Sequence, residues 1–594
     1  MQRRIARNVA LGVLLACSSV RAADDVVLKA MRDELARSMA NLRLEGLEKP
    51  YFIAYRVNER TSAEVSASFG SVLSDSEART RTLTVEVRVG NPALDNSNFI
   101  SFSFGRSGVA QLIGGSVRLP LDDDYVELRR QIWLATDGVY KKALEDLAHK
   151  RAALQNQTRT EQVNDFSMEE AVTLMEAAAL AKLDQAEAKK LVRELSALFR
   201  EMPDVFHSTV RLTASNVYAR YLNSEGTSFT RATPSVAFTA VAATQAPDGM
   251  PLEDFVAAYG RSVNDLPKKE ELAARIRELG ARLAQLRQAS LLDRYNGPVL
   301  FEGQAAAELF SQVFAPKLLA VRRPMADNPQ FGRMASQAED SFLDRIGSRV
   351  LPEFLSLVDN PNATGHNQTP LLGGYNVDDD GVRARETKLV ENGVLKTLLT
   401  TRTPVVGIEH STGNRRGDRV MPSNLILSAE KGASAEEMKE RILRVVKQRG
   451  KDYGIIVRRI GNPFLTLSQD PLRGLFVMPG QEVKGVAGTL TAYKVFPDGH
   501  EELIRNLELS GFTDATFKEI VAVSKTQTVY TAPFASRGAS PFMVFSSFDL
   551  ESLERGGPLV SFVVPSLLFD DLTLKKPSGE VPKPPVAKHP YFDK

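Results

Sequence analysis

The chain has 594 residues, of which 43% are hydrophobic and 25% are charged. This balance is typical of a globular protein, and the length is sufficient for two or more domains. The 75 Lys and Arg residues are matched by 73 Asp and Glu residues, so composition gives no basic excess of the kind that nucleic-acid-binding proteins show, and we expect no nucleic-acid partner.

The first 22 residues have the pattern of an export signal. Arg3, Arg4 and Arg7 form a basic start, and Val9–Ala16 is an apolar run too short to span a bilayer. Val20–Ala22 then offers a small-x-small cleavage site. We therefore expect residues 1–22 to be removed as a signal peptide and the mature protein to be exported, periplasmic or envelope-associated.

Cys17 adds an alternative to simple cleavage. Leu14–Cys17, with the sequence LLAC, resembles a bacterial lipobox, in which the Cys becomes lipidated and N-terminal. A lipid anchor at Cys17 would make the protein an envelope lipoprotein. Cys17 is also the only Cys of the chain, so the mature protein contains no disulfide and no thiolate for catalysis or for metal binding.

Residues 23–295 predict an N-terminal α+β domain with a mixed sheet and long helices. Helical periodicity covers Asp24–Leu44 and Tyr125–Leu154, and a further helix is expected from the capping residue Ser167 to Leu198. Strands are expected at Tyr51–Val57, Glu64–Leu73, Thr82–Val89, Val205–Leu212, Val217–Leu222, Thr227–Arg231 and Ser235–Ala243.

Residues 296–576 predict a C-terminal domain that is mostly antiparallel β, so the whole chain is expected to be α+β. An amphipathic helix, Leu272–Leu292, ends before Gly297-Pro298, which breaks helices and marks the boundary. A short strand at Val299–Phe301 and a helix at Ala305–Phe314 follow. Residues 577–594 contain five Pro and predict a loose tail.

The most informative stretch is Asn376–Gly417. An acidic turn, Asp378–Gly381, precedes a strand-like run at Thr387–Val390. Asn392-Gly393 then predicts a hairpin, because Asn-Gly adopts the positive φ angles that a two-residue loop requires. The stretch ends in Ser411–Gly417, with the sequence STGNRRG.

This order resembles the C-terminal domain of the TldD/PmbA family, peptidases related to the "modulator of DNA gyrase" proteins. The resemblance is strongest in Tyr295–Gly417 and in Pro565–Leu572, and it covers most of the mature chain. It implies a homo- or heterodimer with a TldD/PmbA-type subunit, with a central cavity that admits unfolded peptide.

Active members of that family place Leu-His-Glu-Ala-x-Gly-His on a helix after a strand. The two His and a late Cys hold zinc, and the Glu takes the proton of the zinc-bound water as this water attacks a peptide carbonyl. Here the matching stretch is Val299–Ala306, with Phe301 and Ala306 at the His positions and Glu302 at the position of the general base. We therefore expect an inactive Glu302, no bound metal and no cofactor, and a non-catalytic subunit or peptide-binding scaffold.

Gly413, Asn414 and Arg415 are the expected substrate-binding residues. Backbone near Gly413 can approach a ligand closely, and Arg415 can fork onto a carboxylate such as a peptide C-terminus. The alternative is that Arg415 and Arg416 pair internally with the acids of the Asp378 turn.

Two further functions stay open at this point. One is an active metallopeptidase whose zinc is held by a rearranged set of ligands. The candidate ligands are His366, His410 and Asp378–Asp380. The other is a structural envelope lipoprotein. The Asp378–Asp380 turn is itself expected to cap the chain or to pair with Arg383 and Arg385 rather than to bind Ca²⁺.

Overall fold

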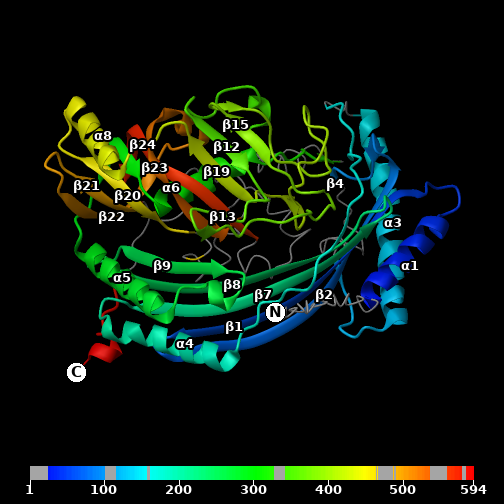
Figure 1. Ribbon diagram of the computed structural model, residues 1–594, viewed down its shortest axis with the longest axis horizontal. Coiled ribbons are helices and arrows are strands. Elements are labelled where there is room, and N and C mark those ends of the chain that lie inside the picture. The colour runs from blue at the N-terminus through cyan, green and yellow to red at the C-terminus, as the bar shows by residue number, and fades with distance from the viewer. Residues whose placement is uncertain are drawn as a thin grey trace, which may run out of the picture.

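The computed structural model describes residues 25–100, 116–156, 161–326, 341–462, 465, 486, 490–534, 558–577 and 583–593 of the chain. The expected signal peptide and Cys17 lie outside these residues. Within them, no helix is long and apolar enough to cross a membrane. Figure 1 shows two layers of structure, a long curved sheet with its own helices and a second, strand-rich domain over one face of that sheet.

Helices begin where the sequence supplies a cap. The Asp25 side chain accepts a hydrogen bond from the Leu28 N–H at 3.0 Å and starts the first helix. Ser434 and Glu437 form a capping box at the start of the last one. The α-helices are α1 Val26–Asn41, α3 Tyr125–Asn156, α4 Gln185–Ala197, α5 Lys269–Gln288, α6 Gln304–Leu309 and α8 Ala435–Gln448.

The N-terminal sheet has eight strands in the order β3-β2-β1-β7-β8-β6, with β5 beside β2 and β9 beside β8. All pairs are antiparallel except β6 with β8, so the predicted mixed sheet and the α+β class are confirmed. The strands are β1 Pro50–Ser68, β2 Ser71–Asn91, β3 Leu94–Asp95, β5 Ser116–Arg118, β6 Thr173–Met175, β7 His207–Asn223, β8 Ser228–Gln245 and β9 Pro251–Gly260. A two-stranded pair, β4 Phe99–Ile100 with β11 Met325–Ala326, joins the two domains.

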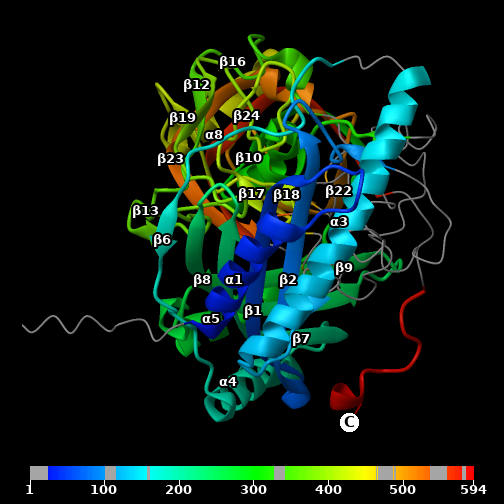
Figure 2. The same cartoon turned by 90° about the vertical axis from the view of Figure 1, so that its right-hand side faces the viewer.

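Two pairs of helices cover this sheet at its opposite ends. α1 and α3 pack against β1 and β2 around buried residues such as Met31, Tyr55 and Leu128. Figure 2 looks at that end and shows both helices in front of the two strands. α4 and α5 bury a second core against β7, β8 and β9, with Val192 and Leu279 at its centre.

Several predicted elements differ from the observed ones. Glu64–Leu73 spans a hairpin turn at Phe69-Gly70, where both residues have positive φ, rather than a strand. β7 and β8 run without the predicted interruptions, and β9 was not predicted. The helix expected from Ser167 begins only at α4, because the preceding segment is held by other parts of the protein: the Ser167 N–H donates to the Arg402 carbonyl, and β6 pairs with β8. Tertiary contacts therefore outweigh the helix propensity of this segment.

The C-terminal domain is built around one long strand, β24. The ten-stranded sheet has the order β10-β20-β21-β22-β24-β19-β12-β15-β16, with β23 also beside β24. Because β10 pairs with both β20 and β24, the first five strands close into a ring. The strands are β10 Arg294–Phe301, β12 Leu355–Asp359, β15 Thr387–Glu391, β16 Val394–Leu395, β19 Asn424–Ala429, β20 Gly454–Ile460, β21 Leu490–Val495, β22 Glu501–Ser510, β23 Ile520–Pro533 and β24 Leu559–Lys575. Small hairpins pair β13 Gly365–His366 with β14 Thr369–Pro370 and β17 Arg415–Arg416 with β18 Arg419–Val420.

Helices α6 and α8 lie on opposite faces of the C-terminal sheet. α6, continued by one π-helical turn at Phe310–Phe314, is enclosed in the main core of the domain. α8 covers the other face through Met438, Ile442 and Val446. The predicted Asn392-Gly393 hairpin is present between β15 and β16, with φ of +49° and +76° at the two turn residues.

Part of the Pro-rich tail contacts the N-terminal domain. The Tyr591 ring stacks on Phe69 at 5.6 Å between centroids, and the guanidinium of Arg200 lies 5.6 Å from the Tyr591 ring. Figure 1 shows the end of the chain below α4. The tail is therefore not loose over His589–Phe592.

Candidate functional site at the domain junction

Asp378 is the centre of the acidic turn and is fully buried. Its carboxylate accepts hydrogen bonds from three backbone N–H groups, those of Val382 at 2.8 Å and of Asp380 and Arg415 at 2.9 Å. Burial, and next the charge of Asp380, raise the pKa of Asp378 to about 8, although the N–H donors act in the opposite direction. This carboxyl group therefore fastens the acidic turn to the loop that carries Arg415.

The other two acids of the turn reach the N-terminal sheet. Asp379 forms ion pairs with Arg231 on β8 and, at 3.6 Å, with Arg56 on β1. Burial alone would raise the pKa of Asp379, but the charges of both arginines lower it to about 2. The Tyr221 hydroxyl of β7 donates to the backbone carbonyl of Asp380 at 3.2 Å. Three strands of one domain thus hold one turn of the other.

The expected pairing of this turn with Arg383 and Arg385 is wrong. Arg383 is exposed, and the Arg385 guanidinium donates to the Ser411 carbonyl instead. Two of the observed partners, Arg56 on β1 and Arg231 on β8, lie more than a hundred residues away in the sequence, so nearby spacing could not identify them. The third, Arg415, is the internal pairing that the sequence left open.

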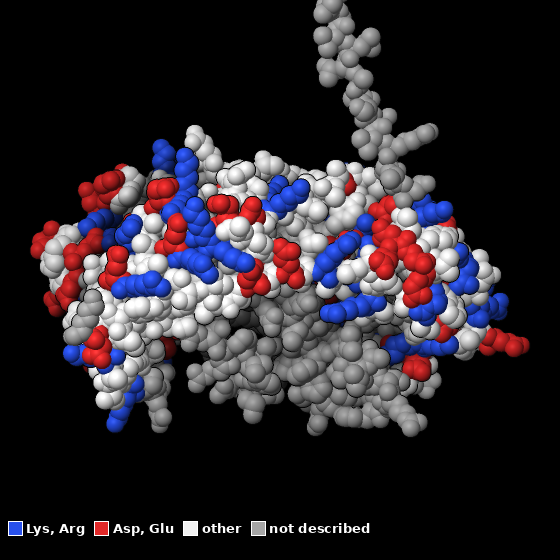
Figure 3. Space-filling model, turned by 90° about the horizontal axis from the view of Figure 1, so that it is seen from below, with Lys and Arg blue, Asp and Glu red and all other residues white. Residues whose placement is uncertain are grey.

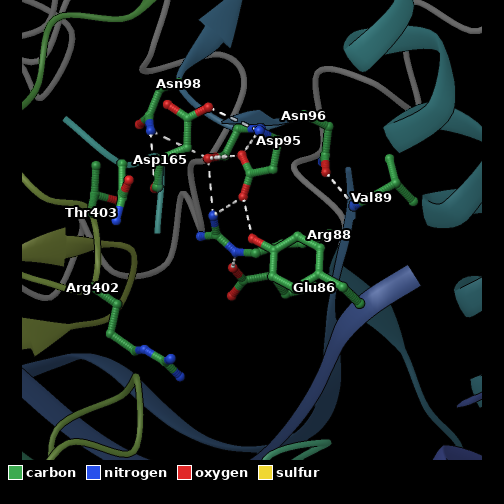
Figure 4. Close-up of polar contacts among 12 residues, drawn as sticks. Glu86, Arg88, Val89, Asp95, Asn96, Asn98, Asp165, Arg402 and Thr403 are labelled. Carbon is green, nitrogen blue, oxygen red and sulfur yellow. Dashed lines mark hydrogen bonds and ion pairs between the residues drawn. The ribbon is translucent and has the colours of Figure 1, made fainter. Parts of the chain in front are cut away.

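Arg88 forms the centre of a second group of charges, inside the N-terminal domain (Figure 4). Its guanidinium contacts Glu86 at 2.6 Å and Asp95 at 2.8 Å, and the Tyr51 hydroxyl donates to Asp95 at 2.7 Å. Burial alone would lower the pKa of Arg88, but the charges of Glu86 and Asp95 outweigh it and keep the pKa above its usual range.

Arg402 brings the C-terminal domain into contact with this group. Its guanidinium contacts Glu225 at 2.6 Å and donates to the Ser167 carbonyl at 2.6 Å. The Phe166 ring lies 3.9 Å from the guanidinium carbon of Arg402 and 3.8 Å from that of Arg88. One aromatic ring therefore contacts two arginines from different domains.

The predicted substrate-binding residues lie beside this junction. Gly413 has φ of +78°, and a Cβ there would lie 2.8 Å from the Arg383 carbonyl oxygen, so its close approach is to the protein's own backbone. Asn414 is buried and donates to Asp359 at 2.8 Å. Arg415 is 24% exposed and contacts Asp380 at 2.7 Å. Arg415 thus pairs internally with an acid of the Asp378 turn. The role of Gly413, Asn414 and Arg415 in substrate binding stays a prediction.

The strand–helix segment with the expected zinc-motif positions lies in the core. Phe301 and Ala306 are both 0% exposed. Phe301 is the last residue of β10, whereas Ala306 is in α6, so positions 301 and 306 do not share one helix and could not present two ligands from it. Glu302 lies between the two elements and contacts Arg458 at 3.0 Å.

Sequence reasoning missed a polar row on α6 and its π-helical turn. Gln304 exchanges two hydrogen bonds with the backbone of Ile460, at 3.0 and 2.9 Å. Glu308, one turn on, accepts from Gln312 at 2.7 Å and from Asn462 at 3.3 Å. The repeat of a polar residue every fourth position in an apolar helix was the available signal.

Two tyrosines adjoin Glu308 from other elements. Burial and the charge of Glu308 raise the pKa values of Tyr530, on β23, and of Tyr259, on β9. Among the described residues, the buried Tyr259 hydroxyl has no hydrogen-bond partner. The charge of Glu308 thus acts on a residue of the N-terminal sheet as well as on its own domain.

The histidines proposed for a rearranged metal site are not assembled into one. His410 is 70% exposed and lies 3.6 Å from Glu169, and His366 is on the β13–β14 hairpin. Among the residues that the structure describes, no three His, Cys, Asp or Glu side chains form a group that could hold a metal ion.

Comparison with known proteins places these features in a family. Residues 294–576 match the model of the PmbA/TldA metallopeptidase C-terminal domain. A metalloprotease of Methanothermobacter thermautotrophicus is 38% identical over 123 residues, and a zinc metalloprotease TldD homolog of Saccharolobus solfataricus is 31% identical over 184. The chain belongs to the TldD/PmbA family. These matches cover 19% and 30% of the chain, and 25% and 35% of the two relatives, so they span well under two thirds of either relative.

The similarity of fold to solved structures extends over 92% of the chain. TldE of Thermococcus kodakarensis superposes with a TM-score of 0.56 at 13% identity, over 92% of this chain and 99% of that one. A Thermotoga maritima protein named for a proposed modulation of DNA gyrase gives a TM-score of 0.58 at 16% identity, over 92% and 99%. At these identities the likeness establishes the fold alone.

Proposed function

We propose that this TldD/PmbA-family protein is exported and non-catalytic, acting as a subunit or a peptide-binding scaffold in proteolysis. One observation carries the proposal: the strand–helix segment Arg294–Leu318 contains neither His nor Cys. No His occurs anywhere between His207 and His366. The segment therefore lacks the His and Cys ligands of the zinc motif whichever of its positions are matched to that motif.

The residues present do not fit zinc. Phe301 and Ala306 offer no lone pair, and both are enclosed in the apolar core of the C-terminal domain. Glu302 has a carboxylate, but its partner is Arg458, and among the described residues it belongs to no group of side chains that could hold a metal ion. We derive no hydrolytic step through a metal at this place.

The proposed partners are a second TldD/PmbA-type subunit, identical or different, and an unfolded peptide. No nucleic acid is among them, since positive and negative side chains are interspersed over the face shown in Figure 3 and the total charges nearly cancel. Export is supported by the basic and apolar pattern of residues 1–22.

The deciding experiment is zinc content per chain. Protein purified without added metal, and a second sample exposed to equimolar zinc and then dialysed, would be analysed for the element. We expect less than about 0.1 zinc per chain in both, because a tight structural or catalytic site needs three or four ligands. One zinc per chain after dialysis would instead favour an active metallopeptidase with a rearranged ligand set.

A second experiment addresses the anchor. Membrane fractionation of the wild type and of Cys17→Ser separates lipidation from simple cleavage. Release of the protein from membranes only in Cys17→Ser would favour the envelope lipoprotein.

A further inference from the structure

Arg416 differs from the other arginines of the domain junction in its surroundings. Its Nη1 donates to the carbonyls of Pro422 and Leu559, both at 3.0 Å. The guanidinium carbon lies 5.3 Å from the centre of the Tyr375 ring. Among the described residues, no carboxylate lies within ion-pair distance of Arg416, and its Nε and Nη2 donate no hydrogen bond.

The neighbouring arginines, apart from the exposed Arg383 and Arg385, each have an acid. Arg402 contacts Glu225 at 2.6 Å, and Arg415 contacts Asp380 at 2.7 Å. The other members of the junction with a carboxylate within 4.0 Å are Arg56, Arg88 and Arg231. Among the less exposed arginines of the junction, as far as the structure describes the chain, Arg416 is therefore the one without an acid at ion-pair distance.

The exception is costly to the folded protein. A half-buried guanidinium with no carboxylate at ion-pair distance loses hydration that carbonyl oxygens replace only in part. Burial lowers the pKa of Arg416, and the charge of Arg231 lowers it further. An internal acid could have removed this cost, as it does for Arg415 in the adjacent position.

The unused atoms have a defined geometry. Nε and Nη2 form the side of the guanidinium that presents two parallel N–H groups, and this fork matches the two oxygens of a carboxylate. Nη1, on the other side, is fixed by its two carbonyl acceptors. The backbone thus holds the fork in place before any ligand arrives, which reduces the entropy lost on binding.

We propose that Arg416 binds the carboxylate of a ligand through Nε and Nη2, and that this carboxylate is the C-terminus of a bound peptide. The identification of the ligand as a peptide rests on the proposed function, whereas the carboxylate site rests on Arg416 alone. Arg415, the residue that the sequence favoured, has its charge met by Asp380 and supports the loop.

The local charges favour a single negative charge over a phosphate. Asp379 and Asp359 both act on Arg416, since each raises its pKa. A dianion would meet more repulsion from these two acids than a carboxylate does. The stacked Tyr375 ring adds an apolar wall, which suits a carboxylate attached to a carbon chain.

The experiment is arginine labelling of the full chain with phenylglyoxal, read at each site by peptide mass spectrometry. We expect Arg416 to react at least about fivefold faster than Arg402 and Arg415, because the guanidinium groups of these two are engaged with acids. N-acetylalanine, a mimic of a peptide C-terminus, should slow labelling at Arg416 at least about threefold, and N-acetylalaninamide should not. Exposed Arg349 is the matched control, which should react without protection by either compound.

Several outcomes would overturn the proposal. One is labelling of Arg416 no faster than of Arg402 while Arg349 reacts. Another is equal protection by the acid and the amide, and a third is protection by inorganic phosphate at concentrations well below those of N-acetylalanine. Arg416→Gln provides a second measurement: thermal stabilisation by N-acetylalanine should be lost in this variant and kept in Arg349→Gln. Zinc content does not enter this experiment, so its failure would leave the proposed non-catalytic role in place.

Discussion

The strand–helix segment of β10 and α6 and the domain junction around Asp378 are both buried, but by opposite means. In the first, Phe301 and Ala306 are enclosed by hydrocarbon. In the second, carboxylates and guanidinium groups are buried against each other across two domains. Apolar burial is stabilising by itself, whereas buried charges depend on every partner being present.

The two regions therefore differ in the kind of side chain that they bury. The two positions of the first segment that would have to hold zinc, Phe301 and Ala306, are residues of the apolar core. The junction keeps a dense set of charges, and within the described residues it leaves Arg416 without a carboxylate at ion-pair distance. The variants described next test the contrast between the two regions.

The largest effect is expected from Arg402→Ala, which removes a charge from the junction. Glu225 and the Ser167 carbonyl would lose their partner, and Phe166 would lose one of its two stacked cations. We expect the free energy of unfolding in urea to fall by about 3–5 kcal/mol. Arg349→Ala, at an exposed site, should change it by less than about 0.5 kcal/mol. Equal values for the two variants would show that the junction is not compensated as described.

The double variant Phe301→His, Ala306→His tests the core side of the comparison. Both imidazoles would be buried among hydrocarbon, and they would come from different elements. We expect a loss of about 3 kcal/mol or more in stability and no gain of zinc by elemental analysis. Acquisition of one zinc per chain by this variant would show that the two positions can act together after all.

The pH dependence of stability distinguishes the two regions, because within the described residues the carboxyl group with a pKa of about 8, that of Asp378, lies at the junction. The folded protein keeps the Asp378 proton to a higher pH than the unfolded chain. The stabilisation is therefore fully present below pH 4 and is lost as the pH rises through 8. We expect the free energy of unfolding to fall by on the order of 2 kcal/mol between pH 6 and pH 9. The fall should be smaller in Asp378→Asn; an identical slope in both proteins would contradict this origin.

The smallest effect is expected from Glu302→Gln. Its ion pair with Arg458 is partly exposed, with 30% and 40% of the two side chains accessible. The loss should be under about 1 kcal/mol, and any peptidase activity of the isolated chain should be unchanged. A large fall in turnover in a folded variant would return Glu302 to the position of a general base.

Local patterns in the sequence predicted those elements whose signals are local. The α+β class, α3 and the Asn392-Gly393 hairpin follow from periodicity and turn chemistry. The helix expected from Ser167 failed because its backbone is held by Arg402 and by β8, far away in the chain. The unpredicted β9 and the single long strand β24 likewise depend on pairing with distant strands.

At the candidate site, too, the features that depend on distant parts of the chain could not be predicted from local patterns. Sequence reasoning found the Asp378 turn and the two adjacent arginines, but it could not tell which arginine is compensated. That distinction depends on where Asp380 points and on the two carbonyls that hold Arg416. It also missed the Arg88–Phe166–Arg402 arrangement, whose members come from three separate parts of the chain.

The order in which the strands are made has a consequence for biogenesis. β24 pairs with β10, β19, β22 and β23, yet it lies more than 250 residues after β10 in the chain. The ring of the C-terminal domain therefore cannot close until residue 575 has left the ribosome, and the apolar edge of β10 must wait unpaired until then. Contacts of such long range form slowly. A nascent chain held open in this way exposes apolar surface for longer, which favours aggregation over folding during the delay.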